Sequence, residues 1–173
     1  MALLCRQYKD GGMSMNPQAN ITERLGAILR EEGGLEERLQ AAVAEIAQQF
    51  DARTCTFHRT TAEDQLLELV AQVGLPPRIA ELAGHIPFGK GMAGVCAQRR
   101  EPVTMCNLQT DDSGVAKPAA RDTRVEGAVV VPLVAEDRVV ATLGIGKGEE
   151  YDYSEDEIRA LEHCASVLMA ALP

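Results

Sequence analysis

Aromatic residues are scarce in this chain of 173 residues, which has no tryptophan and only three phenylalanines and three tyrosines. Hydrophobic residues still make up 46% of the sequence, so its core must be built from aliphatic side chains. No apolar run approaches the roughly 18 residues that a membrane-spanning helix needs. The first residues also lack the basic and apolar regions of a secretory signal peptide. We therefore expect a cytoplasmic protein with one domain and a short extension.

Basic residues are also few, because 17 lysines and arginines stand against 26 aspartates and glutamates, for a net charge of -9. Nucleic-acid phosphates and anionic membrane surfaces are both bound by clusters of positive charge. Neither nucleic acid nor a membrane is therefore an expected partner.

The residue patterns of metal sites and nucleophilic enzymes are missing as well. His58, His85 and His163 lie far apart, and no Cys or His pair has the spacing of a zinc site. There is no nucleophile elbow and no P-loop. Five widely spaced cysteines favour free thiols in a reducing cytosol. The sequence predicts no metal site and indicates no particular cofactor.

Hydrophobic periodicity indicates the order of the secondary structure. Residues 1–34 form a predicted flexible tail with a possible short helix at 22–32, and residues 35–173 form the predicted domain. Runs of antiparallel strands framed by helices are typical of an α+β fold. We expect a central antiparallel sheet of five or six strands, with the N- and C-terminal helices on one face and short helices and loops over the other. The predicted elements are helices at 35–50, 76–84 and 92–99, strands at 52–58, 66–73, 102–105, 128–134 and 139–145, and a final helix behind a capping box at 154–157.

The run Gly89-Lys90-Gly91-Met92-Ala93-Gly94 fits the GxGxxG pattern of dinucleotide-binding folds. Such a site needs a strand before the glycines and a parallel crossover after them. Here a helix that starts at a proline precedes the turn and hairpins follow it, so we disfavour a dinucleotide. The helix start presents free N–H groups beside Lys90, where an anionic group can bind. The alternative is that the turn only packs the helix onto the sheet.

Three segments together resemble the GAF domain family. They are IPFGKGMAGVCAQRREPVTMCNL (86–108), VVVPLVAEDRVVATLGI (129–145) and YSEDEIRALEHCASVLMAAL (153–172). The resemblance extends from residue 35 to residue 172, and it implies a sensor module with a small ligand. Members of the family bind ligands as different as cyclic nucleotides, haem and oxoacids.

One enzymatic branch, the free methionine-R-sulfoxide reductases, is similar to this chain around the glycine turn. That branch uses cysteine thiolates to reduce its substrate. The positions that match its three cysteines are occupied by Ala83, Ala93 and Lys117. We therefore expect that the protein is not an enzyme.

The irregular segment 106–127 concentrates the polar residues of the predicted domain. In GAF domains that bind ligands, the corresponding loop closes the pocket, so the resemblance implies a pocket under this loop. Four cations near its mouth favour a small anionic metabolite as the ligand of a regulatory, small-molecule-sensing domain. The alternative is a solvated loop whose charges pair with one another. The predicted ligand-binding residues are Lys90, Gly91, Cys106, Asn107, Asp111, Lys117, Arg121, Arg124 and Glu126.

Two other functions remain open. The helices around Leu35 and Ile158 can form a homodimer through the terminal helices, which would make the chain an interaction module without a ligand. Cys96 and Cys106 can form a redox-sensing pair. Attachment of haem or a tetrapyrrole through Cys106 or His85 is a weaker alternative. In any of these roles the chain passes its signal to a separate output protein.

Overall fold

A computed structural model describes residues 17–61 and 65–172, and the first sixteen residues of the predicted tail lie outside this range. Its strands are β1 (Thr54–Thr60), β2 (Leu66–Val73), β3 (His85–Pro87), β4 (Val103–Met105), β5 (Ala128–Ala135) and β6 (Arg138–Gly146). Its helices are α1 (Pro17–Ile28), α2 (Leu35–Gln49), α3 (Pro77–Leu82), α4 (Gly91–Arg99), the 3-10 helix η1 (Pro118–Thr123) and α5 (Glu155–Met169).

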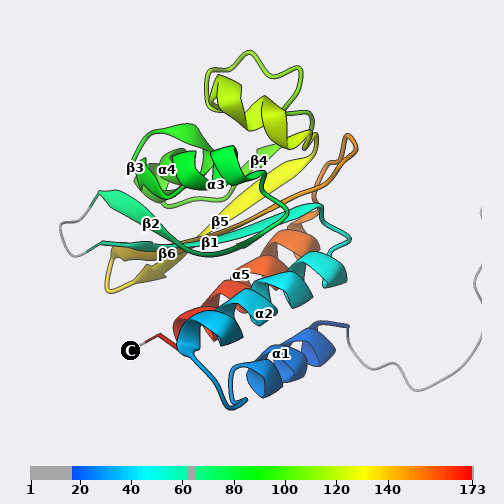
Figure 1. The fold of residues 1–173 in the computed structure, drawn as a ribbon. Coiled ribbons are helices and arrows are strands. Elements are labelled where there is room, and N and C mark those ends of the chain that lie inside the picture. Colours follow the sequence, from blue (N-terminus) through cyan, green and yellow to red (C-terminus); the bar gives the residue numbers. More distant parts are fainter. Residues whose placement is uncertain (1–16, 62–64, 173) are drawn as a thin grey trace, which may run out of the picture.

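The strands form one antiparallel sheet in the order β3-β2-β1-β6-β5-β4. Figure 1 shows α2 and α5 side by side on one face of this sheet, with α3, α4 and η1 on the other side. The predicted α+β architecture is therefore confirmed, with six strands. The two helices that the sequence placed at the ends of the domain do share one face.

The side chains of β1 point alternately to the two faces of the sheet, and helices cover both faces. Cys55 and Phe57 are fully buried against α2 and α5, where they join the larger core cluster. Thr54, Thr56 and His58 point to the opposite face, because successive side chains of a strand alternate. On that face α4 packs Val95 and its neighbours over the sheet in a second cluster.

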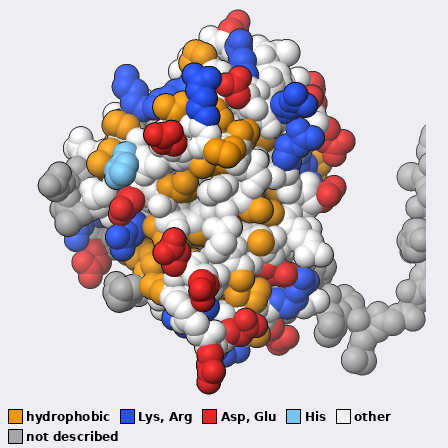
Figure 2. All heavy atoms as spheres, viewed as in Figure 1, with side chains coloured by type: hydrophobic (Ala, Val, Ile, Leu, Met, Phe, Trp, Pro, Cys, Tyr) orange, Lys and Arg blue, Asp and Glu red, His pale blue; other side chains and the backbone are white. Residues whose placement is uncertain are grey.

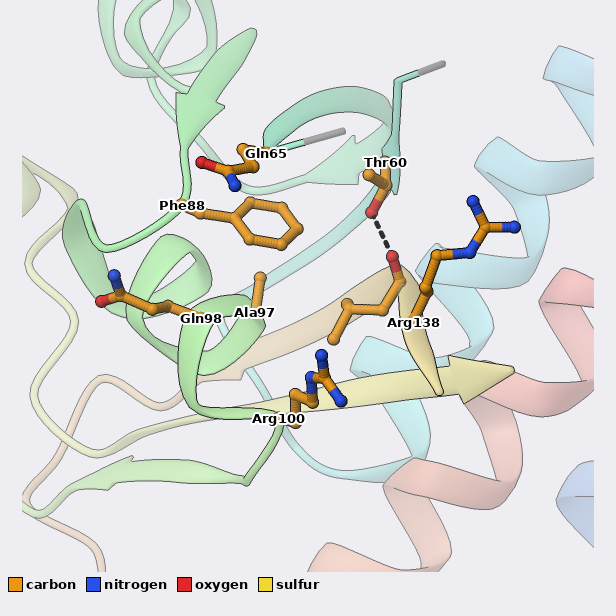
Figure 3. A pocket seen from close by; sticks show the side chains of 8 residues that line it. Thr60, Gln65, Phe88, Ala97, Gln98, Arg100 and Arg138 are labelled. Carbon is orange, nitrogen blue, oxygen red and sulfur yellow. Dashed lines mark hydrogen bonds between the residues drawn. The ribbon is translucent and has the colours of Figure 1, made fainter. Parts of the chain in front are cut away.

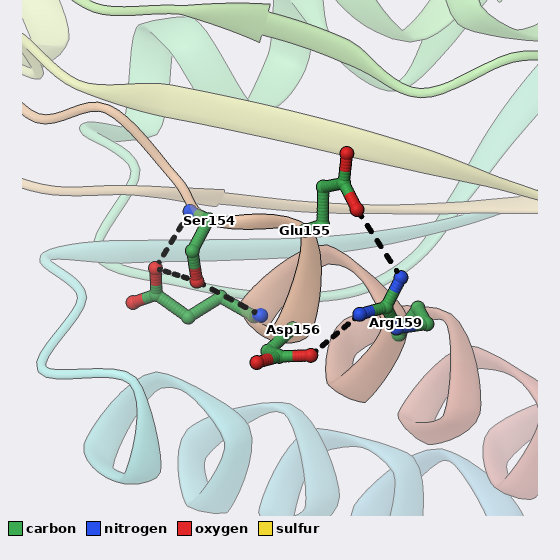
Figure 4. Close-up of polar contacts among 5 residues, drawn as sticks. Ser154, Glu155, Asp156 and Arg159 are labelled. Carbon is green, nitrogen blue, oxygen red and sulfur yellow. Dashed lines mark hydrogen bonds and ion pairs between the residues drawn. The ribbon is translucent and has the colours of Figure 1, made fainter.

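The N-terminus of α5 is held by the predicted capping box, which the structure confirms (Figure 4). The Ser154 hydroxyl accepts a hydrogen bond from the Glu157 N–H at 3.3 Å, and the Glu157 carboxylate accepts one from the Ser154 N–H at 2.9 Å. Arg159 forms ion pairs with Glu155 and Asp156 in the same turn. These contacts satisfy N–H groups that have no partner inside the helix.

Helix α1 begins five residues earlier than the predicted helix and ends four residues earlier. It packs against α2 and α5 (Figure 1), where Ile21 and Leu25 of α1, and Leu29 just after it, are buried in the larger core cluster. Arg24 of α1 also forms an ion pair with Glu45 of α2. The division of the chain at residue 34 stays a prediction, and α1 on its N-terminal side contacts the helices beyond it.

Two short elements differ from the predicted series. β3 pairs with the start of β2 through only three residues, a length too short to show strand alternation. The segment 107–127, predicted as irregular, contains η1, which begins at Pro118.

Among the described residues, no helix is both long and apolar enough to cross a membrane.

Candidate functional site

The glycine turn packs the start of α4 against the strand before it. A Cβ atom on Gly94 would lie 2.3 Å from the carbonyl oxygen of Pro87, which only a glycine permits. The N–H of Gly89 donates to the carbonyl of Gly94 at 2.7 Å, and Gly89 has a φ of +77°. The turn therefore has the packing role that the sequence left open as an alternative to ligand binding.

A cavity of about 170 Å³ lies between α3, the start of α4 and the loop 106–127. We call it the apolar cavity, because nearly all of its lining side chains are apolar, and Figure 2 shows hydrophobic side chains gathered over this side of the molecule. Lys117 is the one charged residue among those that the structure places in its wall. The lining residues are Ile79, Leu82, Ala83, Ile86, Gly91, Met92, Leu108, Ala116, Lys117, Ala119 and Ala120.

The loop that closes the apolar cavity is ordered by its own polar side chains. The Gln109 amide donates to the carbonyls of Arg121 and Val125 at 3.2 and 2.6 Å. The Arg121 guanidinium donates to the Asp111 carbonyl at 3.0 Å. The Asn107 side chain accepts a hydrogen bond from the Gln109 N–H at 3.0 Å. Gln109 thus joins both ends of the loop, a role that its sequence position did not indicate.

Two of the predicted ligand-binding residues, Gly91 and Lys117, line the apolar cavity. Two more, Arg121 and Asp111, contact each other within the loop. Lys90 is exposed at the start of α4. Of the four predicted cations, Lys117 is the one among the residues that line the apolar cavity, and a role in ligand binding stays a prediction for each residue of the set.

The remaining predicted residues lie along the edge of the loop. Cys106 is exposed. Asn107 donates to the Glu150 carboxylate at 3.2 Å. The carbonyl of Arg124 accepts a hydrogen bond from the Arg53 guanidinium at 3.2 Å, and Glu126 pairs through its backbone with neighbouring segments. These contacts connect the loop to the segments that flank β1 and β6.

His58 lies on the sheet beneath the end of α3. Its Nε2 is 3.0 Å from the carbonyl oxygen of Ala83, a residue of the apolar cavity wall. Thr142 is its cross-strand neighbour on β6, and both residues are almost fully buried. Burial lowers the pKa of His58 from 6.5 to about 4, and the Ala83 carbonyl opposes this shift only in part. The imidazole is therefore neutral at physiological pH and fixes α3 to the sheet.

The two cysteines of the redox hypothesis are both free and lie in different surroundings. Cys96 is buried against β5, with Sγ 3.5 Å from the Val130 carbonyl, and burial raises the pKa of its thiol to about 12. Cys106 is exposed directly after β4. A redox pair of Cys96 and Cys106 stays a prediction.

Within residues 17–61 and 65–172, no group of three or more His, Cys, Asp or Glu side chains could hold a metal ion. His85 is exposed on β3.

Known structures share this fold over nearly the full chain. The GAF domain of an Acinetobacter phosphoenolpyruvate-protein phosphotransferase matches with a TM-score of 0.73 at 20% identity, covering 90% of this chain and 92% of that chain. A free methionine-R-sulfoxide reductase from Neisseria meningitidis, in complex with its substrate, matches with a TM-score of 0.71 at 15% identity, covering 96% and 94%. A putative GAF sensor protein from Burkholderia vietnamiensis matches with a TM-score of 0.69 at 20% identity, covering 88% and 90%.

Identities this low show a common fold and leave the ligand open. No curated protein matched the sequence. The family model described as GAF domain matches residues 33–172, which is most of the chain. The protein therefore belongs to the GAF domain family.

Proposed function

We propose that the protein is a regulatory module that senses a small molecule in the apolar cavity under the loop 106–127. GAF domains generally serve as sensory or regulatory modules. The observation that carries the proposal is the cavity itself, whose wall combines an apolar lining with a single cation, Lys117. Small-molecule sites are typically concave and mostly apolar, with a few polar groups that orient the ligand.

The chemistry of the wall defines the ligand class. An apolar body would contact side chains such as Ile79 and Leu108, and one anionic group would reach Lys117. This retains the small anionic metabolite of the sequence prediction but gives it one charge partner in the wall instead of four. A polyanion would leave most of its charge without a partner in an apolar cavity, which is costly.

We also propose that the module catalyses no reaction. Ala83 and Lys117, which match two of the reductase cysteines by resemblance, both line the apolar cavity and carry no thiol. Turnover of free methionine sulfoxide by the purified protein above the uncatalysed rate would contradict this part of the proposal.

The signal of such a module passes to a separate output protein. A homodimer through the terminal helices stays a prediction, and within this chain α1 packs against α2 and α5.

Calorimetric titration with hexanoate tests the ligand class, since hexanoate has an apolar chain and one carboxylate. The substitution Lys117→Gln is expected to weaken hexanoate binding roughly fivefold, the effect of an ion pair near the surface. The matched control is Lys90→Gln, because Lys90 is exposed and does not line the cavity. Equal weakening by both substitutions, or equally tight binding of hexanamide, would overturn the proposal.

A further inference from the structure

A second cavity, of about 280 Å³, lies at the other end of α4, between the end of β1, the residue before β2 and the start of β6 (Figure 3). We call it the arginine cavity. It is separate from the apolar cavity, with which it shares no lining residue. Its principal side chains flank the β1–β2 connection, follow β3, end α4 and begin β6, and they are Thr60, Gln65, Phe88, Gln98, Arg100 and Arg138.

An aromatic ring stands in the middle of the arginine cavity. Figure 3 shows the Phe88 ring between Gln65 and Ala97. The N–H of Phe88 donates to the Gln65 carbonyl at 2.9 Å, which fixes the position of the ring's backbone. The other two phenylalanines, Phe50 and Phe57, belong to the core on the helix side of the sheet. Phe88 is half-buried and offers a surface on which a flat ring can stack.

Arg100 supplies a guanidinium group that can exchange partners. It follows α4 in the left-handed conformation, with a φ of +59°. Its Nη1 lies 3.5 Å from an oxygen of Asp137, whose side chain is 98% exposed. Such an exposed ion pair contributes little to stability, so another carboxylate can replace Asp137 at small cost.

The glycine turn also shapes this cavity. A Cβ atom on Gly89 would lie 2.8 Å from the Gln98 amide oxygen, so the absence of that Cβ lets Gln98 lie against the turn. Gln65 and Gln98 thereby add two amide groups to the wall. On the opposite side, the Thr60 hydroxyl donates to the Val139 carbonyl at 2.7 Å.

The charge of the lining differs from that of the whole chain. The protein carries a net charge of -9, yet among the described residues that line this wall the charged ones are Arg100 and Arg138, with Asp137 paired to Arg100. Guanidinium groups bind carboxylates through paired hydrogen bonds and also stack on flat rings. The cavity therefore favours an anion that carries a planar group.

We propose that the arginine cavity is a second ligand site, which binds small aromatic carboxylates. The ring of the ligand stacks on Phe88, and its carboxylate binds Arg100 in place of Asp137. The site does not depend on the apolar cavity, and its ligand differs from hexanoate in having a flat ring.

Titration of ¹⁵N-labelled protein with benzoate tests this site. The NMR signals of the Gln65 and Gln98 side-chain amides and of the Phe88 backbone amide are expected to change position together. These changes should reach a plateau as the benzoate concentration rises. Benzamide lacks the charge, and cyclohexanecarboxylate lacks the aromatic face. Both are expected to bind several times more weakly than benzoate.

The substitution Arg100→Gln is expected to weaken benzoate binding about fivefold, the effect of an ion pair near the surface. Arg99→Gln is the matched control, since Arg99, the last residue of α4, is exposed and is not among the lining residues. Its affinity for benzoate should stay unchanged, and the spectra of both variants should show an intact fold.

Equal effects of the two substitutions would overturn the proposal, as would benzamide binding as tightly as benzoate. Shifts confined to the apolar cavity, at Leu108 and Ala116, would also overturn it by placing benzoate there. If a short polyglutamate peptide shifts the same amides at lower concentration than benzoate, the site is one for an acidic protein segment instead.

Discussion

A methyl group at Gly94 would collide with a backbone atom, because its Cβ would lie 2.3 Å from the Pro87 carbonyl. Gly94→Ala is therefore expected to lower the free energy of unfolding by about 2 kcal/mol or more, the usual cost of overpacking. Gly91→Ala is the matched control in the same helix, because a Cβ there meets nothing within 4 Å. Its cost should be about 1 kcal/mol, from the positive φ alone. If urea unfolding shows the same loss of free energy for both substitutions, close packing does not explain why position 94 is a glycine.

His58 makes the stability of the protein depend on pH. Its pKa is about 4 in the folded state and near 6.5 when unfolded, so the unfolded chain binds more protons between these values. The free energy of unfolding therefore falls as the pH decreases from about 6.5 to about 4, by about 3 kcal/mol from this residue. Above pH 6.5 the imidazole is neutral in both the folded and the unfolded state, so it does not make the free energy of unfolding depend on pH.

The substitution His58→Gln should remove this part of the pH dependence, measured by urea unfolding at several pH values. Carboxylates also titrate in the lower part of the range, so the informative quantity is the difference between the variant and the original protein. His163→Gln is the control, because His163 is exposed on α5. Parallel curves for the original protein and His58→Gln would contradict the burial of a neutral imidazole.

At single residues, the sequence allowed only part of the site to be predicted. Lys117 and Gly91 were singled out and line the apolar cavity. Arg121 was singled out on the same grounds but bonds to the Asp111 carbonyl. The difference lies in local hydrogen bonds of the loop, such as those of Gln109, which charge patterns do not reveal.

Helix α1 is the element whose role was least visible in the sequence. Leu25 is fully buried between α1 and the helices beneath it. The substitution Leu25→Ala is expected to lower the free energy of unfolding by about 3 kcal/mol, the typical cost of such a truncation in a core. Ala27→Ser, on the exposed side of α1, should have almost no effect. If both substitutions are neutral, α1 is not part of the folded unit.

The longer elements could be predicted because their patterns have a clear period. The bounds of β2 match the prediction of 66–73, and the Ser154 capping box marked the start of α5. β3 was missed because three residues show no period, and α1 begins five residues before the predicted start at residue 22. The arginine cavity had no sequence signal, since Phe88, Arg100 and Arg138 meet only after the sheet has formed.

Across the whole molecule, the two sides of the sheet have different roles. The face covered by α2 and α5 holds the larger core, while the face under α3, α4 and the loop 106–127 carries the apolar cavity and the arginine cavity. The GAF family membership and the fold agree with the sequence resemblance. Neither states which ligand is bound, so the ligand class rests on the chemistry of the cavity walls.

The central claim is that the apolar cavity binds a small ligand with an apolar body and one anionic group. A titration of ¹³C-methyl-labelled protein with hexanoate tests it most directly. The NMR signals of the Ile79 and Leu108 methyl groups should change position and show nuclear Overhauser contacts to the hexanoate chain. The signals of the Leu25 and Leu168 methyl groups, in the helix-side core, should stay in place. Unmoved Ile79 and Leu108 methyl groups at high hexanoate concentration, or shifts in the helix-side core alone, would contradict the claim.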